Sequence, residues 1–95
     1  MRILICDDDT LIISQLNKFI LEYFERNSLK VPAIAHFSSG EELLADTEEK
    51  DILFLDVEMP GLNGIYVGNE LKQTHPNLII MIVTSYIEYL DEAMR

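Results

Sequence analysis

Apolar residues occur along the chain in four short runs, and polar or helically patterned segments separate them. The runs are RILIC, VPAIAHF, ILFL and LIIMIVTS, which begin at Arg2, Val31, Ile52 and Leu78. Runs of this length, bounded by polar residues, are typical of strands. The runs therefore predict four strands. Pro32, near the start of the second run, makes that run an expected edge strand.

The segments between the runs have the patterns of helices. Residues 10–27 carry apolar side chains at the spacing of one helix face, which we expect to face the core: Ile12, Leu16, Phe19, Ile20, Tyr23 and Phe24. Ser39 and Glu42 are spaced as a capping box, which predicts a short helix through about Asp46. Residues 63–74 predict a third helix, and the stretch IEYLDEAMR begins a fourth.

The alternation of strands and helices indicates the fold class. It implies right-handed crossovers and a parallel sheet with helices on both faces. The run ILFL shows no polar alternation, as expected for a strand that is covered on both faces. The sequence predicts one α/β domain over residues 1–95, a flavodoxin-like doubly wound sheet in strand order 2-1-3-4.

Composition and charge narrow the possible partners. A formal net charge of −10 argues against direct binding of nucleic acid or an anionic membrane by this segment. It suits a cation or a basic patch on another protein, although a generically acidic surface would also account for most of it. The start MRILICDDD is no signal peptide, and the run LIIMIV is too short to span a bilayer. The single Cys6 is expected to be a buried thiol in a cytoplasmic protein.

Polar residues follow three of the predicted strands at their carboxyl ends. Asp7 and Asp8 follow the first strand, Asp56 the third and Thr84 the fourth. In open α/β sheets, sites form beyond these ends at the point where the strand order reverses. Neighbouring strands lie about 4.8 Å apart, so we expect Asp7, Asp8 and Asp56 to share one pocket.

Three carboxylates in one pocket repel one another. Two unit charges about 4 Å apart cost roughly 4 kcal/mol at an effective dielectric constant of about 20. Either one carboxyl group stays protonated or a hard cation binds. Mg²⁺ is favoured because it takes oxygen ligands and is often shared with a phosphate. With Mg²⁺ present, Asp56 becomes a candidate nucleophile that forms an aspartyl phosphate, to which the Thr84 hydroxyl could donate.

Each of these residues also has an ordinary structural interpretation. Acids after a strand often cap the next helix, and Asp9 or Thr10 is expected to do so here. A Thr at a strand end is usually a turn residue, and turn chemistry accounts for Gly61, Asn63 and Gly64. The functional interpretation therefore depends on the joint pattern of three strand ends in the right order.

Three stretches together resemble a known family. ILICDDD, LFLDVEMPGLNG and IIMIVTSY are similar to the signatures of the receiver domain of two-component response regulators. The third is similar in particular to receivers that precede a LytTR-type DNA-binding domain. The resemblance implies that Asp56 accepts a phosphoryl group from a sensor histidine kinase. It also implies that Asp7, Asp8, Asp56 and the backbone carbonyl of Glu58 hold Mg²⁺.

The resemblance implies further roles. Thr84 would be the switch hydroxyl, and Glu58 and Tyr86 would flank the path of the hydrolytic water. The protein would be a switch rather than a turnover enzyme, and it would act on an output domain outside this chain, expected to bind DNA and regulate transcription. The family continues with a fifth strand that carries a Lys and then a fifth helix. No Lys follows Lys72, so we expect a receiver that is incomplete at its C-terminal end.

Two other functions fit parts of the sequence. A degenerate receiver would act as a dimerisation module, and the open edge of the strand LIIMIV predicts a homodimer or oligomer in either case. A haloacid-dehalogenase-like phosphatase would use Asp7 and Asp9 as its D-x-D pair. Leu11 stands where that motif needs Thr, so the sequence disfavours this enzyme.

Overall fold

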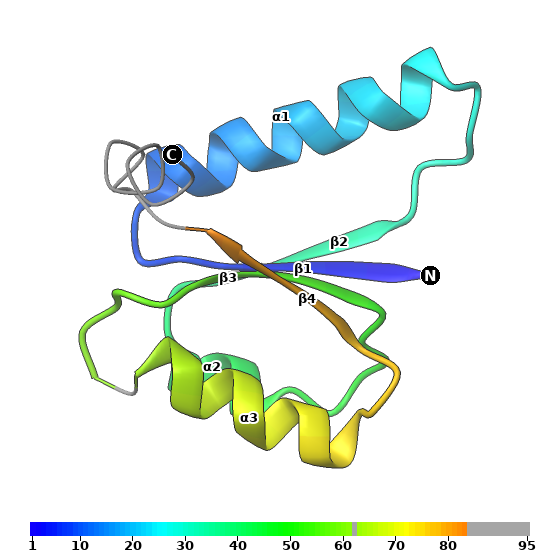
Figure 1. Ribbon diagram of the computed structural model, residues 1–95. Coiled ribbons are helices and arrows are strands. Elements are labelled where there is room, and N and C mark those ends of the chain that lie inside the picture. Colours follow the sequence, from blue (N-terminus) through cyan, green and yellow to red (C-terminus); the bar gives the residue numbers. More distant parts are fainter. Residues whose placement is uncertain (62, 84–95) are drawn as a thin grey trace, which may run out of the picture.

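The computed structural model describes residues 1–61 and 63–83, which form a four-stranded parallel sheet with helices on both faces (Figure 1). The elements in chain order are β1 (Arg2–Cys6), α1 (Thr10–Arg26), β2 (Ala33–Phe37), α2 (Gly40–Ala45), β3 (Ile52–Asp56), α3 (Gly64–Thr74) and β4 (Ile79–Val83). The strand order is β2-β1-β3-β4, which confirms the predicted fold class and the edge position of β2. The expected final helix, Thr84 and Tyr86 lie outside the described residues.

The core has one layer on each face of the sheet. In Figure 1, α1 covers one face and α2 and α3 cover the other. The larger layer, on the α2 and α3 face, is made of Leu4, Cys6, Leu43, Leu53, Leu55, Met59, Val67, Leu71 and Leu78. The layer beneath α1 contains Ile3, Ile5, Ile13 and Ile20. Because β1 contributes to both layers, its apolar run has no polar alternation.

The buried side chains of α1 differ in part from the prediction. Phe19 and Tyr23 were expected in the core, but their exposed fractions are 67% and 53%. Ile13, which the prediction left out, is buried together with Ile20. Phe19 and Tyr23 line a surface pocket together with Phe54 of the sheet, and no element of the described chain covers them there. The predicted core face was therefore wrong at Phe19 and Tyr23.

Side-chain caps begin each of the three helices in the described part of the chain. The Asp9 carboxylate accepts a hydrogen bond from the Leu11 N–H at 2.9 Å, so Asp9 rather than Thr10 caps α1. The Ser39 hydroxyl accepts from the Glu42 N–H at 3.2 Å, which confirms the predicted start of α2. These caps are local interactions that the sequence pattern alone can predict.

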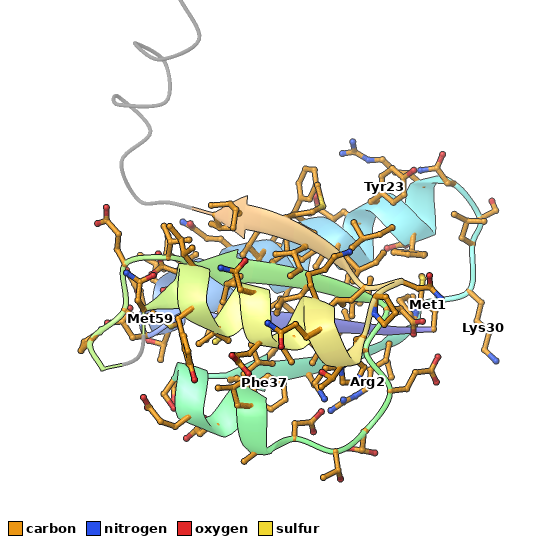
Figure 2. The ribbon with its side chains drawn as sticks, turned by 60° about the horizontal axis from the view of Figure 1, so that its bottom comes forward. Met1, Arg2, Tyr23, Lys30, Phe37 and Met59 are labelled. Atoms are coloured by element: carbon orange, nitrogen blue, oxygen red, sulfur yellow. The ribbon has the colours of Figure 1, made fainter. Side chains whose placement is uncertain are left out.

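A charged cluster joins elements at the opposite end of the sheet from the strand ends with the aspartates. Asp46 accepts hydrogen bonds from Arg2 Nη1 at 2.7 Å and from Lys50 Nζ at 2.8 Å. Lys50 is only 6% exposed, and its ammonium group also donates to the carbonyl oxygens of Asp46 and Glu48. The cluster thus ties the end of α2 to the start of β1. Arg2 lies far from Met59, which is near the other end of the sheet (Figure 2).

Candidate functional site

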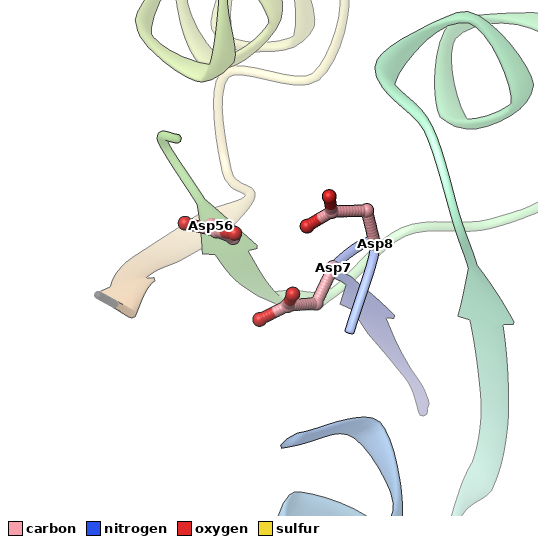
Figure 3. Close-up of side chains that lie close together, drawn as sticks. All are labelled: Asp7, Asp8 and Asp56. Atoms are coloured by element: carbon pink, nitrogen blue, oxygen red, sulfur yellow. The ribbon is translucent and has the colours of Figure 1, made fainter. Parts of the chain in front are cut away.

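Three carboxylates meet at the carboxyl edge of the sheet. Asp7 and Asp8 follow β1, and Asp56 is the last residue of β3. Cys6 pairs with Leu55 in the parallel register, so the next residues on the two strands, Asp7 and Asp56, are neighbours. Oxygen atoms of Asp7, Asp8 and Asp56 lie within 4.8 Å of one another (Figure 3). The structure therefore brings together the three carboxylates that the sequence placed in one pocket.

Backbone groups hold Asp7 in place. Its N–H donates to the carbonyl of Phe37 at 3.0 Å, which extends the pairing of β1 with β2 by one residue. Its Oδ1 accepts from the Asp9 N–H at 2.9 Å. Asp7 is 4% exposed, whereas Asp8 is an exposed residue. The site consequently has a buried side and a side that is open to solvent.

Asp56 is fixed by the segment that follows it. Its Oδ1 accepts a hydrogen bond from the Glu58 N–H at 2.9 Å, and the residue is 7% exposed. This hydrogen bond fixes the orientation of the carboxylate. The Glu58 side chain is exposed. Thr84 and Tyr86, the other predicted participants, fall outside the described residues.

Burial changes the acidity of one member of the cluster. Desolvation, together with the nearby Asp56 and Asp8 carboxylates, raises the pKa of Asp7 to about 6, although the hydrogen bond from the Asp9 N–H lowers it. Within residues 1–61 and 63–83, no Lys, Arg or His forms an ion pair with Asp7, Asp8 or Asp56. The negative charge of the cluster is therefore not offset by side chains of the described part of the chain.

The donor set fits a hard divalent cation. The three side chains offer only carboxylate oxygens, which Mg²⁺ prefers, and one of them is exposed, so water could complete an octahedral shell. The neighbouring thiol of Cys6 does not compete as a ligand. Burial raises its pKa to about 12, and its Sγ lies 3.8 Å from Met59 Sδ inside the core.

The Asp9 side chain takes no part in the cluster, although its backbone N–H donates to Asp7. Its carboxylate is engaged in the cap of α1 through the Leu11 N–H. The D-x-D pair of Asp7 and Asp9, on which the phosphatase alternative depended, is thus divided between a strand end and a helix cap.

Sequence reasoning missed two residues that support the site. Met59 is 7% exposed and packs beside Cys6, although it lies in a turn-like stretch. Gly64, interpreted above as turn chemistry, begins α3 in close contact with the backbone of Asp56. The apolar Met within EMPGLNG was the available signal for the first. Nothing in the sequence distinguished Gly64 from an ordinary turn glycine.

Comparison with known proteins identifies a family and several relatives. A family model described as "Response regulator receiver domain" matches residues 3–95. The alkaline phosphatase synthesis transcriptional regulatory protein PhoP of Bacillus subtilis is 34% identical over 98% of this chain and 37% of its own length. A cyclic di-GMP phosphodiesterase of Thermotoga maritima is 27% identical over 90% of this chain and 22% of its own length. The chain therefore spans well under half of these relatives.

A solved structure shares the fold. The response regulator protein TrrA of Thermotoga maritima, solved in complex with Mg²⁺-BeF, superposes with a TM-score of 0.77 at 29% identity. The match covers 96% of this chain and 75% of that one. No helix within residues 1–61 and 63–83 has the length and apolar character needed to cross a membrane.

Proposed function

The chain belongs to the response regulator receiver domain family, and we propose that it is the phospho-accepting part of a two-component response regulator. Asp56 accepts a phosphoryl group from a sensor histidine kinase. Asp7, Asp8, Asp56 and the backbone carbonyl of Glu58 hold Mg²⁺. The observation that supports this most directly is the convergence of three carboxylates, with oxygen atoms within 4.8 Å of one another, at the carboxyl edge of the sheet.

The reaction transfers a phosphoryl group from a nitrogen atom of the donor to a carboxylate oxygen of Asp56. An oxygen of Asp56 forms a bond to phosphorus as the bond from phosphorus to the donor nitrogen breaks, and the nitrogen keeps the electron pair and takes up a proton. The Glu58 N–H, which donates to Asp56 Oδ1, holds this carboxylate in its orientation. When bound, Mg²⁺ would offset the charge on the phosphoryl oxygens. Thr84 would donate its hydroxyl to one of them, and Glu58 and Tyr86 would flank the path of the hydrolytic water.

The output of the switch belongs to the same proposal. The relatives carry different functions in their names, one a transcriptional regulatory protein and one a phosphodiesterase. The stretch IIMIVTSY favours a DNA-binding output domain of the LytTR type outside this chain, and hence a cytoplasmic transcription regulator. The chain itself would act as a switch that gains and loses its phosphoryl group, not as a turnover enzyme.

Phosphorylation by a small donor tests the proposal. The protein is incubated with acetyl phosphate and Mg²⁺, and the modified residue is located by mass spectrometry. We expect one phosphoryl group on Asp56, stable in acid and labile in base, and none in Asp56→Asn or in the presence of EDTA. Asp9→Asn is the matched control, because Asn caps a helix as well as Asp does and the residue is outside the cluster. A phosphate on Ser85 or Tyr86 would contradict the assignment.

A second candidate function is self-association, with or without phosphorylation. β4 is the edge strand of the described sheet, and its side chains Ile79, Met81 and Ile82 are 59%, 49% and 56% exposed. An exposed apolar edge is a template for pairing with another strand. Sedimentation at several protein and salt concentrations tests this role. We expect Ile82→Lys to weaken association and Leu29→Lys, at a comparably exposed position between α1 and β2, to leave it unchanged; a wild-type monomer that persists in high salt would rule it out.

A further inference from the structure

Gly64 begins α3 against the backbone of the last residues of β3. A Cβ atom at this position would lie 2.5 Å from the Cα of Val57 and 2.6 Å from the carbonyl oxygen of Asp56. Real Cβ atoms essentially never come within 3.0 Å of such atoms, and ordinary contacts begin at 3.4 Å. Any side chain at Gly64 would therefore push α3 and the end of β3 apart by about 1 Å. Both obstructing atoms belong to the backbone, so neither can rotate away.

This contact lies beside the segment that orients the Asp56 carboxylate. Residues 57–61 leave β3, and within them the Glu58 N–H donates to Asp56 Oδ1 at 2.9 Å. The far side of the turn is held by Asn63, whose Oδ1 accepts from the Ile65 N–H at 2.7 Å and so caps α3. A change in the distance between Gly64 and Val57 would therefore move the backbone next to Glu58 and so change the position of the Glu58 N–H.

We propose that Gly64 is a positioning residue for the site. Because it has no side chain, the first turn of α3 rests directly on Asp56 and Val57, and this contact sets the path of residues 57–61. That path in turn sets the orientation of the Asp56 carboxylate through the Glu58 N–H. The consequence for phosphoryl transfer rests on the function proposed above. The expected change in the position of the Glu58 N–H does not rest on that function, because it is a property of the unphosphorylated protein.

Gly68 is a matched control one turn further along α3. A Cβ at Gly68 would lie 3.5 Å from Leu55 Cδ2 and 3.7 Å from Ile80 Cδ1, which are ordinary contacts with side chains. Gly64→Ala and Gly68→Ala thus make the same chemical change in the same helix. Only the first creates a clash with backbone atoms.

The experiment measures two properties in the purified, folded protein. The first is the amide resonance and hydrogen exchange of Glu58, by ¹⁵N NMR without donor. The second is the rate of phosphorylation by acetyl phosphate at saturating Mg²⁺ and varied donor concentration. For Gly64→Ala we expect a shifted, faster-exchanging Glu58 amide and a maximal rate lower by about 10- to 100-fold, since an error of about 1 Å in a reacting group has costs of this size. Gly68→Ala should stay within about twofold of wild type in rate and leave the Glu58 amide unchanged.

The outcomes separate the two proposals. Equal Glu58 amides and equal rates in Gly64→Ala and wild type would overturn the positioning role. If Gly64→Ala does not fold, Asn63→Ala decides, because it loosens the same turn without adding atoms. A selective change at the Glu58 amide in Asn63→Ala would then support the role, and an unchanged amide would overturn it. If the wild type accepts no phosphoryl group, the proposed function fails while the NMR comparison still decides the role of Gly64.

Discussion

The Sγ atom of Cys6 lies 3.8 Å from the Sδ atom of Met59 in the interior of the protein. Cys6 directly precedes Asp7, and Met59 comes three residues after Asp56. The contact between the two sulfur atoms thus joins the two strand ends that carry the buried carboxylates. The packing of the core on the α2 and α3 face continues up to the candidate site and holds its two halves together.

Truncation of Met59 should destabilise the protein. Met59→Ala removes a buried side chain next to Cys6, and changes of this kind typically lower the free energy of unfolding by about 2–4 kcal/mol. Urea denaturation followed by circular dichroism measures the change. Met81→Ala is the control, because Met81 on β4 is 49% exposed and should cost less than about 1 kcal/mol. Equal losses in the two variants would contradict the role of Met59 in the core.

Asp46 should contribute to stability at neutral pH and lose this contribution in strong acid. Hydrogen bonds from Arg2, together with the Lys50 ammonium, lower the pKa of Asp46 from 3.8 to about 2. A lowered pKa in the folded state adds stability above pH 4 that disappears as the pH falls through about 2. Asp46→Asn should therefore cost about 1–2 kcal/mol at pH 7, after allowance for solvent screening, and little near pH 2. Urea denaturation of both proteins across this range measures the difference, and a cost that does not depend on pH would contradict the assignment.

Asp7 should have the opposite pH dependence in metal-free protein. Its pKa is raised to about 6, mainly by burial, so the folded state binds its proton more tightly than the unfolded state does. The associated stability is fully present below pH 3.8 and is lost as the pH rises through about 6. In EDTA at pH 7, Asp7→Asn should be more stable than wild type by roughly 1–3 kcal/mol, and the two proteins should converge near pH 4. Thermal unfolding at several pH values tests this, and a less stable Asp7→Asn in EDTA at pH 7 would contradict it.

Mg²⁺ should bind weakly and with little selectivity over Mn²⁺, because the proposed ligands are carboxylates, a carbonyl and water. Asp8→Asn removes one charge from the exposed side of the cluster and should weaken binding by about tenfold, the effect of roughly 1.4 kcal/mol. Isothermal titration of the two proteins measures the affinities. Asp9→Asn, which keeps the cap of α1, should match wild type. Equal affinity in wild type and Asp8→Asn would remove Asp8 from the ligand set.

The sequence by itself determined where the strands and helices of the described chain lie and which side chains could form the site. Each strand is a short apolar run, and the Ser39 and Asp9 caps depend on groups within three residues of each other. Asp7 and Asp56 could be placed together because parallel strands end at one edge of a sheet. The roles of these carboxylates, and that of Thr84, remain predictions.

Only the tertiary structure decided features that depend on residues far apart in the chain. Phe19 is exposed although it belongs to the apolar stripe of α1, because no element of the described chain covers the pocket that it lines with Phe54, and helical periodicity alone does not show which positions are covered. Asp46 accepts a hydrogen bond from Arg2, which lies 44 residues earlier in the chain, and no local pattern predicts that pairing. Gly64 is distinguished from a common turn glycine by the approach of α3 to the backbone of Val57. Local sequence patterns indicate which secondary structure each segment favours. Close packing in the folded protein determines which helix faces, strands and backbone segments come into contact.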